Sequence, residues 1–154
     1  MIPETTTRVA RHTAEHMNEQ IRRQTEESVA RTAAAGPSAI ERRLEELDRE
    51  WDIERMLEAN AASVALVGLG LGVFVDRRWF ILPAAVAGFL LQHAIQGWCP
   101  PVPLFRRLGV RTQTEIDYER YALKALRGDF QQLPTEGYGA ARTSGTRALE
   151  AVQR

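Results

Sequence analysis

The chain has 154 residues, with 20 basic and 20 acidic side chains, no formal net charge and a single cysteine. This length indicates one domain, or one domain with tails. The neutral charge argues against a nucleic-acid partner held by bulk charge, and one cysteine excludes both an intramolecular disulfide and a thiolate zinc cluster. The mean hydropathy of -0.30 is typical of a soluble protein, but the apolar residues are concentrated in one stretch.

The first 38 residues are polar, and no apolar core with a cleavage site follows Met1, so we expect no signal peptide. The Ala-, Glu- and Arg-rich composition of residues 7–35 predicts a helix. This segment is either a solvated helix or disordered until a partner orders it, because few apolar residues are available for burial. These are Val9, Met17, Ile21 and Val29.

His12 and His16 belong to an H-x-x-E-H sequence, a pattern known from zinc proteases. A catalytic zinc needs a third protein ligand. The remaining histidine, His93, lies in an apolar run, and no acidic third ligand can be identified. We therefore predict no metal site and no other cofactor.

Residues 39–58 are predicted to form an amphipathic helix. Ser38 and Glu41 have the spacing of a capping box. The helix either packs against its own protein or in a short coiled coil, or it lies along a membrane surface. Its apolar stripe consists of Ile40, Leu44, Leu47 and Trp51.

Two charge-free runs follow, of seventeen residues at 59–75 and twenty at 79–98, counting His93 as neutral. A helix needs about 17–25 apolar residues to cross a bilayer. A domain this small rarely surrounds two helices that are apolar on every side. We therefore predict a transmembrane helical hairpin, with spans of about 59–75 and 79–98.

The basic residues near the two runs predict the orientation of this hairpin. The turn contains two of them, Arg77 and Arg78, against ten in the flanks. The positive-inside rule then places both termini in the cytoplasm. The ten are Arg42, Arg43, Arg49, Arg55, Arg106, Arg107, Arg111, Arg120, Lys124 and Arg127.

Small and aromatic residues provide packing and interface positions within the hairpin. Gly68 and Gly72 form a GxxxG pair, and Ala84 and Gly88 a second pair of small residues. Such pairs allow helix backbones to approach closely in lipid, within one hairpin or between copies. Tryptophans prefer the headgroup level, and the candidate anchors are Trp51, Trp79 and Trp98.

Several polar residues gather near one end of the two spans. Buried polar groups in a membrane need partners, and they point either to a solute path or simply to hydrogen bonding between helices. We favour the second reading because neither span contains an acidic residue. The cluster consists of Asn60, Ser63, Gln92, His93 and Gln96.

Cys99 follows the second span and is a candidate thiol site. Arg106 and Arg107 lie nearby in the sequence, so the thiol is either accessible with a lowered pKa or packed as a small apolar residue. Residues 99–130 are predicted to form a cytoplasmic Pro-rich turn and an amphipathic helix from Thr114, and residues 131–154 a mostly disordered tail.

The stretch from about Glu54 to Leu108 resembles the YgaP-like transmembrane family of bacterial inner-membrane proteins. The resemblance rests on Asn60-Ala61, on the Gly-rich first span and above all on the Gly97-Trp98-Cys99-Pro100 ending. Residues 111–130 are similar to the tail of a proteobacterial subgroup. The resemblance implies a two-helix hairpin, cytoplasmic termini and self-association. Some members have a fused rhodanese domain, which this chain lacks, so sulfurtransferase activity is not carried over.

The sequence therefore predicts an all-α protein, a transmembrane hairpin flanked by amphipathic cytoplasmic helices, in the bacterial inner membrane. We find no catalytic motif, and expect a non-enzymatic subunit that forms a homo-oligomer or joins a larger membrane complex. Two alternatives stay open. One is an oligomeric conduit for a small solute such as a sulfur species, and the other is thiol-based sulfur or redox chemistry at Cys99.

Overall fold

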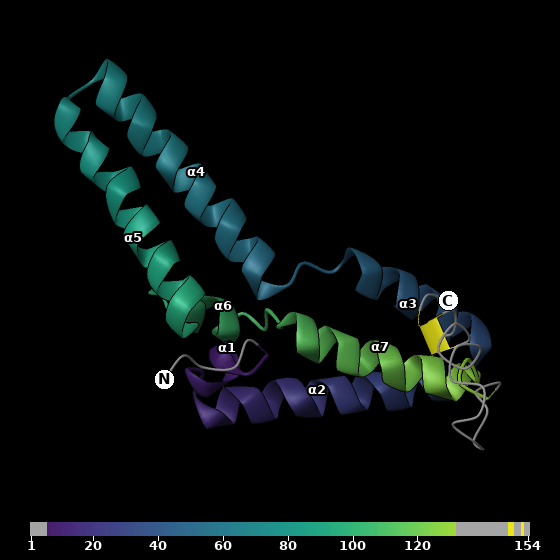
Figure 1. Cartoon of the computed structure of the whole chain (residues 1–154). Coiled ribbons are helices and arrows are strands. Elements are labelled where there is room, and N and C mark those ends of the chain that lie inside the picture. Colours follow the sequence, from purple (N-terminus) through teal and green to yellow (C-terminus); the bar gives the residue numbers. More distant parts are fainter. Residues whose placement is uncertain (1–5, 132–147, 150–151, 153–154) are drawn as a thin grey trace, which may run out of the picture. The chain divides into compact units, whose positions relative to one another are not determined.

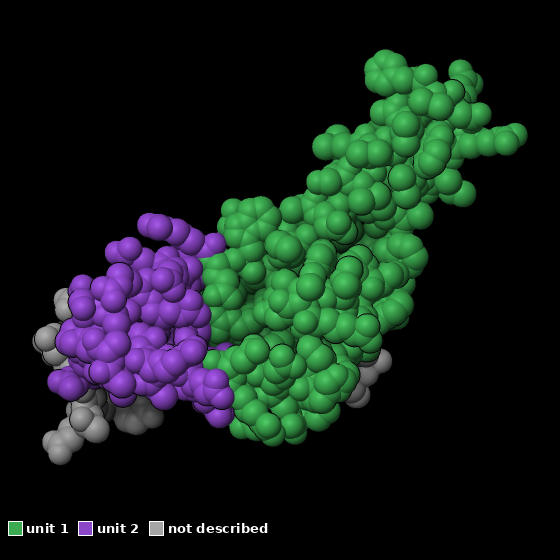
Figure 2. All heavy atoms as spheres, turned by 180° about the vertical axis from the view of Figure 1, so that it is seen from behind, with its two compact units in different colours: residues 1–24, 50–116 green, residues 25–49, 117–154 purple. Residues whose placement is uncertain are grey.

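The computed structural model describes residues 6–131, 148, 149 and 152, and within this part of the chain it is helical, with no strand. Clustering of its contacts gives two compact units, Met1–Gln24 with Glu50–Ile116 and Thr25–Arg49 with Asp117–Arg154 (Figure 2). The helices in chain order are α1 (Arg8–Arg11), α2 (Glu15–Ala34), α3 (Pro37–Arg49), α4 (Ile53–Phe74), η1 (Arg77–Phe80), α5 (Ile81–Gln96), α6 (Val102–Arg107) and α7 (Gln113–Arg127) (Figure 1).

In the first unit, α4 and α5 lie side by side and run in opposite directions, with the 3₁₀ turn η1 between them (Figure 1). The turn begins at Asp76, whose carboxylate accepts a hydrogen bond from the Arg78 N–H at 2.7 Å. The two helices approach closely near this turn. A Cβ atom added to Gly68 would lie 2.7 Å from Pro83 Cδ, and one added to Gly72 would lie 2.7 Å from the Phe80 ring.

Two helical stretches, Pro37–Phe74 and Arg77–Gln96, are long and apolar enough to cross a membrane. The charge-free part of the first lies within α4. Only 22% and 6% of their most apolar segments are buried. Large apolar side chains are instead exposed along both helices, among them Leu66, Val73, Phe74 and Ile81.

At the start of α4, the end away from the turn, the first unit has an apolar core with a buried charged group beside it. Val9, Ile53, Leu57, Cys99 and Val102 form the core. Arg106 on α6 is only 1% exposed, and its two terminal nitrogens donate to Glu115 at 2.6 and 2.7 Å. The guanidinium also donates to the Val110 carbonyl and to Asn18 Oδ1. This ion pair joins α6 to the start of α7.

The second unit also contains a buried charge. Ile40, Leu44 and Leu47 on α3 are buried, as their stripe predicted. Glu119 on α7 is 0% exposed and accepts hydrogen bonds from Arg43 Nε at 2.8 Å and from Ser28 Oγ at 2.7 Å. A buried carboxylate is tolerated only with such partners.

The helix predicted over 39–58 is two helices in the structure. The first, α3, ends at Arg49, and α4 begins at Ile53 with Asp52 as its N-cap. The Asp52 carboxylate accepts a hydrogen bond from the Arg55 N–H at 3.0 Å, which stabilises a new helix start within the continuous apolar stripe. Trp51 falls between the helices and is 44% exposed, so it does not extend the buried stripe.

Other predicted helix ends shift for similar reasons. Pro37, and not Ser38, opens α3, which fits the preference for proline in the first turn. The cap of α7 is Thr112 and not Thr114, because Thr112 and Glu115 exchange backbone-to-side-chain hydrogen bonds. The helix ends before Gly128, which has a φ of +94°.

The predicted 7–35 helix is interrupted between α1 and α2, and α6 was not predicted. The disordered tail predicted over 131–154 lies outside the described residues, apart from residues 131, 148, 149 and 152.

Candidate functional site

A charged cluster joins α1 to the ends of α4 and α5 that lie away from the turn. Arg8 Nη2 donates to Glu54 Oε1 at 2.9 Å, and His93 Nε2 lies 2.8 Å from Glu54 Oε2. Arg8 Nη1 also donates to the Ala94 carbonyl at 3.0 Å, one of the final carbonyls of α5 that a helix leaves unpaired. One carboxylate therefore connects three helices within the first unit.

The protonation of this cluster follows from its geometry. A carboxylate only accepts hydrogen bonds, so His93 must have a proton on Nε2. Burial of Glu54 raises its pKa, but the hydrogen bonds from Arg8 and His93, with their charges, outweigh burial and lower the pKa below 4.5. Glu54 is therefore ionised at neutral pH. It lies in the first turn of α4, where a negative charge also matches the helix dipole.

Gly97 is necessary for this arrangement. It ends α5 with a φ of +78°, a conformation that other residues rarely adopt. A Cβ atom at this position would lie 2.6 Å from Arg8 Cβ. Glycine therefore allows α1 to pack directly on the end of α5.

Cys99 lies two residues after Gly97, and its side chain is buried, with 3% exposed. Burial raises the pKa of its thiol, and the charge of Glu54 raises it further, whereas a backbone hydrogen bond from Val102 lowers it; the net direction is upward. The lowered pKa considered from the sequence is therefore wrong. Of the two basic residues invoked for it, Arg106 and Arg107, the first is paired with Glu115. This thiol packs with the apolar core of the first unit.

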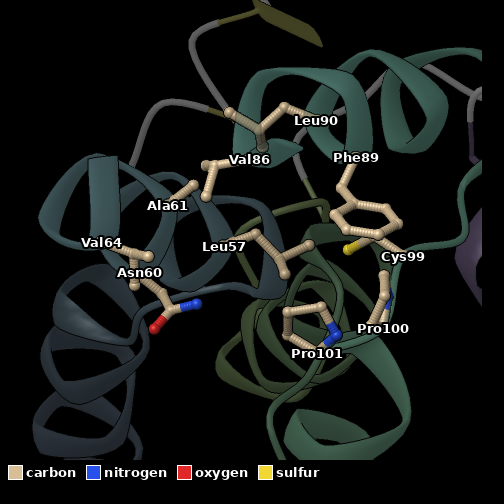
Figure 3. Close-up of a pocket in the computed structure, with 10 residues that line it drawn as sticks. All are labelled: Leu57, Asn60, Ala61, Val64, Val86, Phe89, Leu90, Cys99, Pro100 and Pro101. Atoms are coloured by element: carbon tan, nitrogen blue, oxygen red, sulfur yellow. The ribbon is translucent and has the colours of Figure 1, made fainter. Parts of the chain in front are cut away.

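An apolar pocket of about 210 Å³ lies between α4 and α5 beside Cys99 (Figure 3). Its lining from α4 follows one helical face, at positions 57, 60, 61 and 64, and its lining from α5 another, at positions 86, 89 and 90. Pro100 and Pro101 close it on a third side. Asn60 is the one residue of this lining with an amide side chain.

The structure does not bring the predicted polar cluster together as one network. His93 binds Glu54, and Ser63 Oγ donates to the Ala59 carbonyl of its own helix at 2.8 Å. Asn60 lines the pocket. Gln92 is partly buried and Gln96 is exposed. Within the described part of the chain, no side-chain hydrogen bond joins two of these five residues.

The two predicted pairs of small residues lie in different environments. Gly68 and Gly72 face α5 and η1 at close range. Ala84 and Gly88 are exposed on α5, and a Cβ atom added to Gly88 would meet nothing within 4 Å.

The candidate aromatic anchors are also at the surface, at least in part. Trp51 and Trp79 are each 44% exposed, and Trp98 is half-buried. The Arg55 guanidinium lies over the Trp51 ring, 4.3 Å from its centroid. Such a cation–π contact stabilises both side chains at an exposed position.

His12 and His16 do not share a helix. His12 ends α1, where its Nδ1 lies 2.9 Å from the Arg8 carbonyl, and His16 lies in α2. Among the described residues, no group of three or more metal-ligating side chains occurs.

Sequence reasoning missed Arg8, Glu54 and the pocket. Glu54 precedes the charge-free run by five residues and was given no role from the sequence. The available signal was the combination of two residues: the carboxylate of Glu54 shortly before the first span and His93 near the end of the second. The pocket had a signal too, in two facing stripes of apolar residues at helical spacing.

Comparisons with known proteins give no relative for this chain. No family model, no curated protein and no solved structure matches it.

Proposed function

We propose that this chain is a non-enzymatic integral membrane protein whose α4 and α5 form a hairpin across the bilayer. The observation that supports this most directly is the exposure of their apolar side chains. In a soluble protein the core helices are mostly buried. Here only 22% of the most apolar segment of the first helical stretch is buried, and 6% of that of the second. Contiguous apolar surface of this kind marks contact with lipid or with another protein.

The proposed orientation places both termini in the cytoplasm of a bacterial cell. Arg77 and Arg78 in the η1 turn are the basic residues on the far side. The flanking helices contribute ten, and the rule depends on their number near the spans and not on net charge. Pairing of Arg106 with Glu115 therefore does not alter this count.

The proposed role is that of a subunit, in a homo-oligomer or in a larger membrane complex. Two helices leave little room for a pore of their own. The exposed small residues Ala84 and Gly88 on α5 would let a neighbouring transmembrane helix approach closely. The resemblance to the YgaP-like family predicts the same role, and it stays a prediction because no family model matches the chain.

The mass of the native complex tests this proposal. The tagged full chain is washed in its membranes with alkaline carbonate, extracted in a mild detergent and analysed by native mass spectrometry. We expect it to stay in the membrane pellet and to appear as a defined homo-oligomer or with stoichiometric foreign subunits. A chain released by carbonate would contradict the membrane assignment, and a bare monomer would contradict the subunit role.

A matched pair of variants locates the contact in that complex. Gly88→Leu adds a bulky side chain to the exposed small-residue face of α5, whereas Ala87→Leu adds a leucine at an exposed neighbour that does not share this face. We expect Gly88→Leu to shift the complex toward smaller species and Ala87→Leu to leave it unchanged. Equal masses for both variants would place the contact elsewhere.

A further inference from the structure

We propose that the pocket between α4 and α5 holds one acyl chain of a phospholipid from the surrounding bilayer. This inference rests on the proposed membrane hairpin and adds a ligand to it. The pocket is lined by three segments, α4, α5 and the Pro100–Pro101 corner (Figure 3).

The shape of the pocket follows from how the two helices pack. Near the turn, glycines at 68 and 72 bring α4 against Pro83 and Phe80 with no room for an added Cβ atom. Toward the other end the same face of α4 presents Val64, Ala61 and Leu57, and these side chains line the pocket (Figure 3). The helices are thus tight at one end and separated at the other.

The size and lining of the pocket select the ligand. Its volume of about 210 Å³ lies below the ~300 Å³ at which pockets for drug-sized ligands begin, so a folded cofactor does not fit. A segment of one narrow hydrocarbon chain does, with the rest of that chain outside the pocket. The aliphatic and aromatic lining offers little hydrogen bonding, which a polar solute would need to replace its water.

The location of the pocket favours a membrane lipid over a water-borne ligand. Most of its lining belongs to the charge-free helices, including Phe89, which is 45% exposed. Asn60 lies one residue after the charge-free run begins, near the expected headgroup level, where its amide can bond to an ester carbonyl. An acyl chain already in the bilayer enters from the side without crossing water.

The test measures phospholipid retained by the full chain. The protein is reconstituted in vesicles of palmitoyl-oleoyl phosphatidylethanolamine and phosphatidylglycerol, moved into mild detergent by serial exchange, and analysed by native mass spectrometry. We expect one phospholipid per chain after loosely associated lipid is removed. Palmitate added in place of phospholipid serves as a second probe.

Two pairs of variants separate the pocket from the general lipid-facing surface. Val64→Phe and Leu90→Trp fill the pocket from opposite helices. Val67→Phe and Leu91→Trp add the same bulk at positions that are 59% and 63% exposed. Displacing about two methylenes from the pocket should weaken lipid retention about tenfold, whereas the exposed variants should match the unmodified chain.

A second measurement needs no variant and covers the case in which a filled pocket prevents folding. A phospholipid with a photoreactive acyl chain is crosslinked to the unmodified chain after detergent exchange. We expect labelling at Phe89, Leu90 and Leu57, and not at the outward-facing Leu66 and Leu69. Labelling confined to the outward positions would overturn the inference.

The remaining outcomes are distinct. If the chain resists carbonate but retains no phospholipid, the lipid site is overturned and the hairpin is not. The same holds if the pocket variants and the exposed variants retain equal amounts of phospholipid. Retention of palmitate without phospholipid overturns the stated ligand. A chain released by carbonate overturns the proposed function itself.

Discussion

The α4–α5 pair exposes large apolar side chains, whereas the helices that flank it bury charged ones. Phe74 and Ile81 on the pair are 87% and 76% exposed, whereas Arg106 and Glu119 outside it are 1% and 0% exposed. A protein surrounded by water on all sides rarely exposes a contiguous apolar surface, and it buries charges only in pairs. The proposed membrane hairpin accounts for this contrast, because it places lipid around the pair and water around the other helices.

The largest effect is expected from breaking the buried ion pair between α6 and α7. Glu115→Ala leaves the Arg106 guanidinium buried without its carboxylate and also removes the acceptor of the Thr112 N–H. We expect a loss of about 3–5 kcal/mol in the free energy of unfolding. Denaturant titration of the detergent-solubilised chain, followed by circular dichroism, measures it.

Two controls sharpen that result. Glu45→Ala removes an exposed carboxylate and should change stability by less than about 0.5 kcal/mol. The double variant Arg106→Met with Glu115→Leu removes both charges and should recover most of the loss. A single variant as stable as the Glu45 control would mean that the pair does not hold α6 to α7.

A smaller effect is expected from the glycines that bring α4 and α5 together. In Gly68→Val the new Cβ atom meets Pro83 Cδ at 2.7 Å, so the helices must separate, at a cost of about 1–3 kcal/mol. Gly70→Val is the matched control, because a Cβ atom there meets nothing within 4 Å. Thermal unfolding in detergent compares them, and equal melting temperatures would argue against a close approach at Gly68.

The smallest effect concerns pH at the junction of the two regions. The pKa values of Glu54 and Glu115 are lowered below 4.5 by their partners, so both carboxylates stabilise the folded state above that pH. Stability should fall as the pH drops below 4.5 through their folded-state pKa values. Glu54→Gln should lose part of this dependence of stability on acid pH, and its stability should vary with pH near neutrality in the same way as that of the unmodified chain.

Melting temperatures measured between pH 7 and pH 3 test this (a range chosen to bracket the carboxyl pKa). Asp48→Asn is a suitable control, since its carboxyl is 69% exposed in its ion pair with Arg120. If Glu54→Gln and Asp48→Asn have the same acid profile as the unmodified chain, Glu54 does not contribute the stability that its contacts imply.

The two apolar spans could be predicted from the sequence because a run without charges is a local property. The buried stripe of α3 was visible for the same reason, at Ile40, Leu44 and Leu47. The break between α3 and α4 could not be predicted in this way, since Trp51 continues the apolar stripe of α3. Only the Asp52 cap marks the start of α4.

The candidate site was harder to predict because its contacts join distant residues. Glu54 meets His93 across 39 positions and Arg8 across 46. Nothing in the local pattern selects these partners from the other charged residues. The role of Cys99 stays a prediction, but the accessible environment considered for its thiol was wrong, because burial depends on how α1, α4 and α6 pack around it.

The side on which the η1 turn lies tests the central claim most directly. In a Cys99→Ala background, Asp76→Cys places one thiol at the turn and Glu45→Cys places one on α3. A maleimide that cannot cross membranes is applied to intact cells. The account predicts labelling of the Asp76 variant at once and of the Glu45 variant only after permeabilisation. Equal accessibility of the two thiols in intact cells, or none before permeabilisation, would contradict a hairpin that crosses the bilayer.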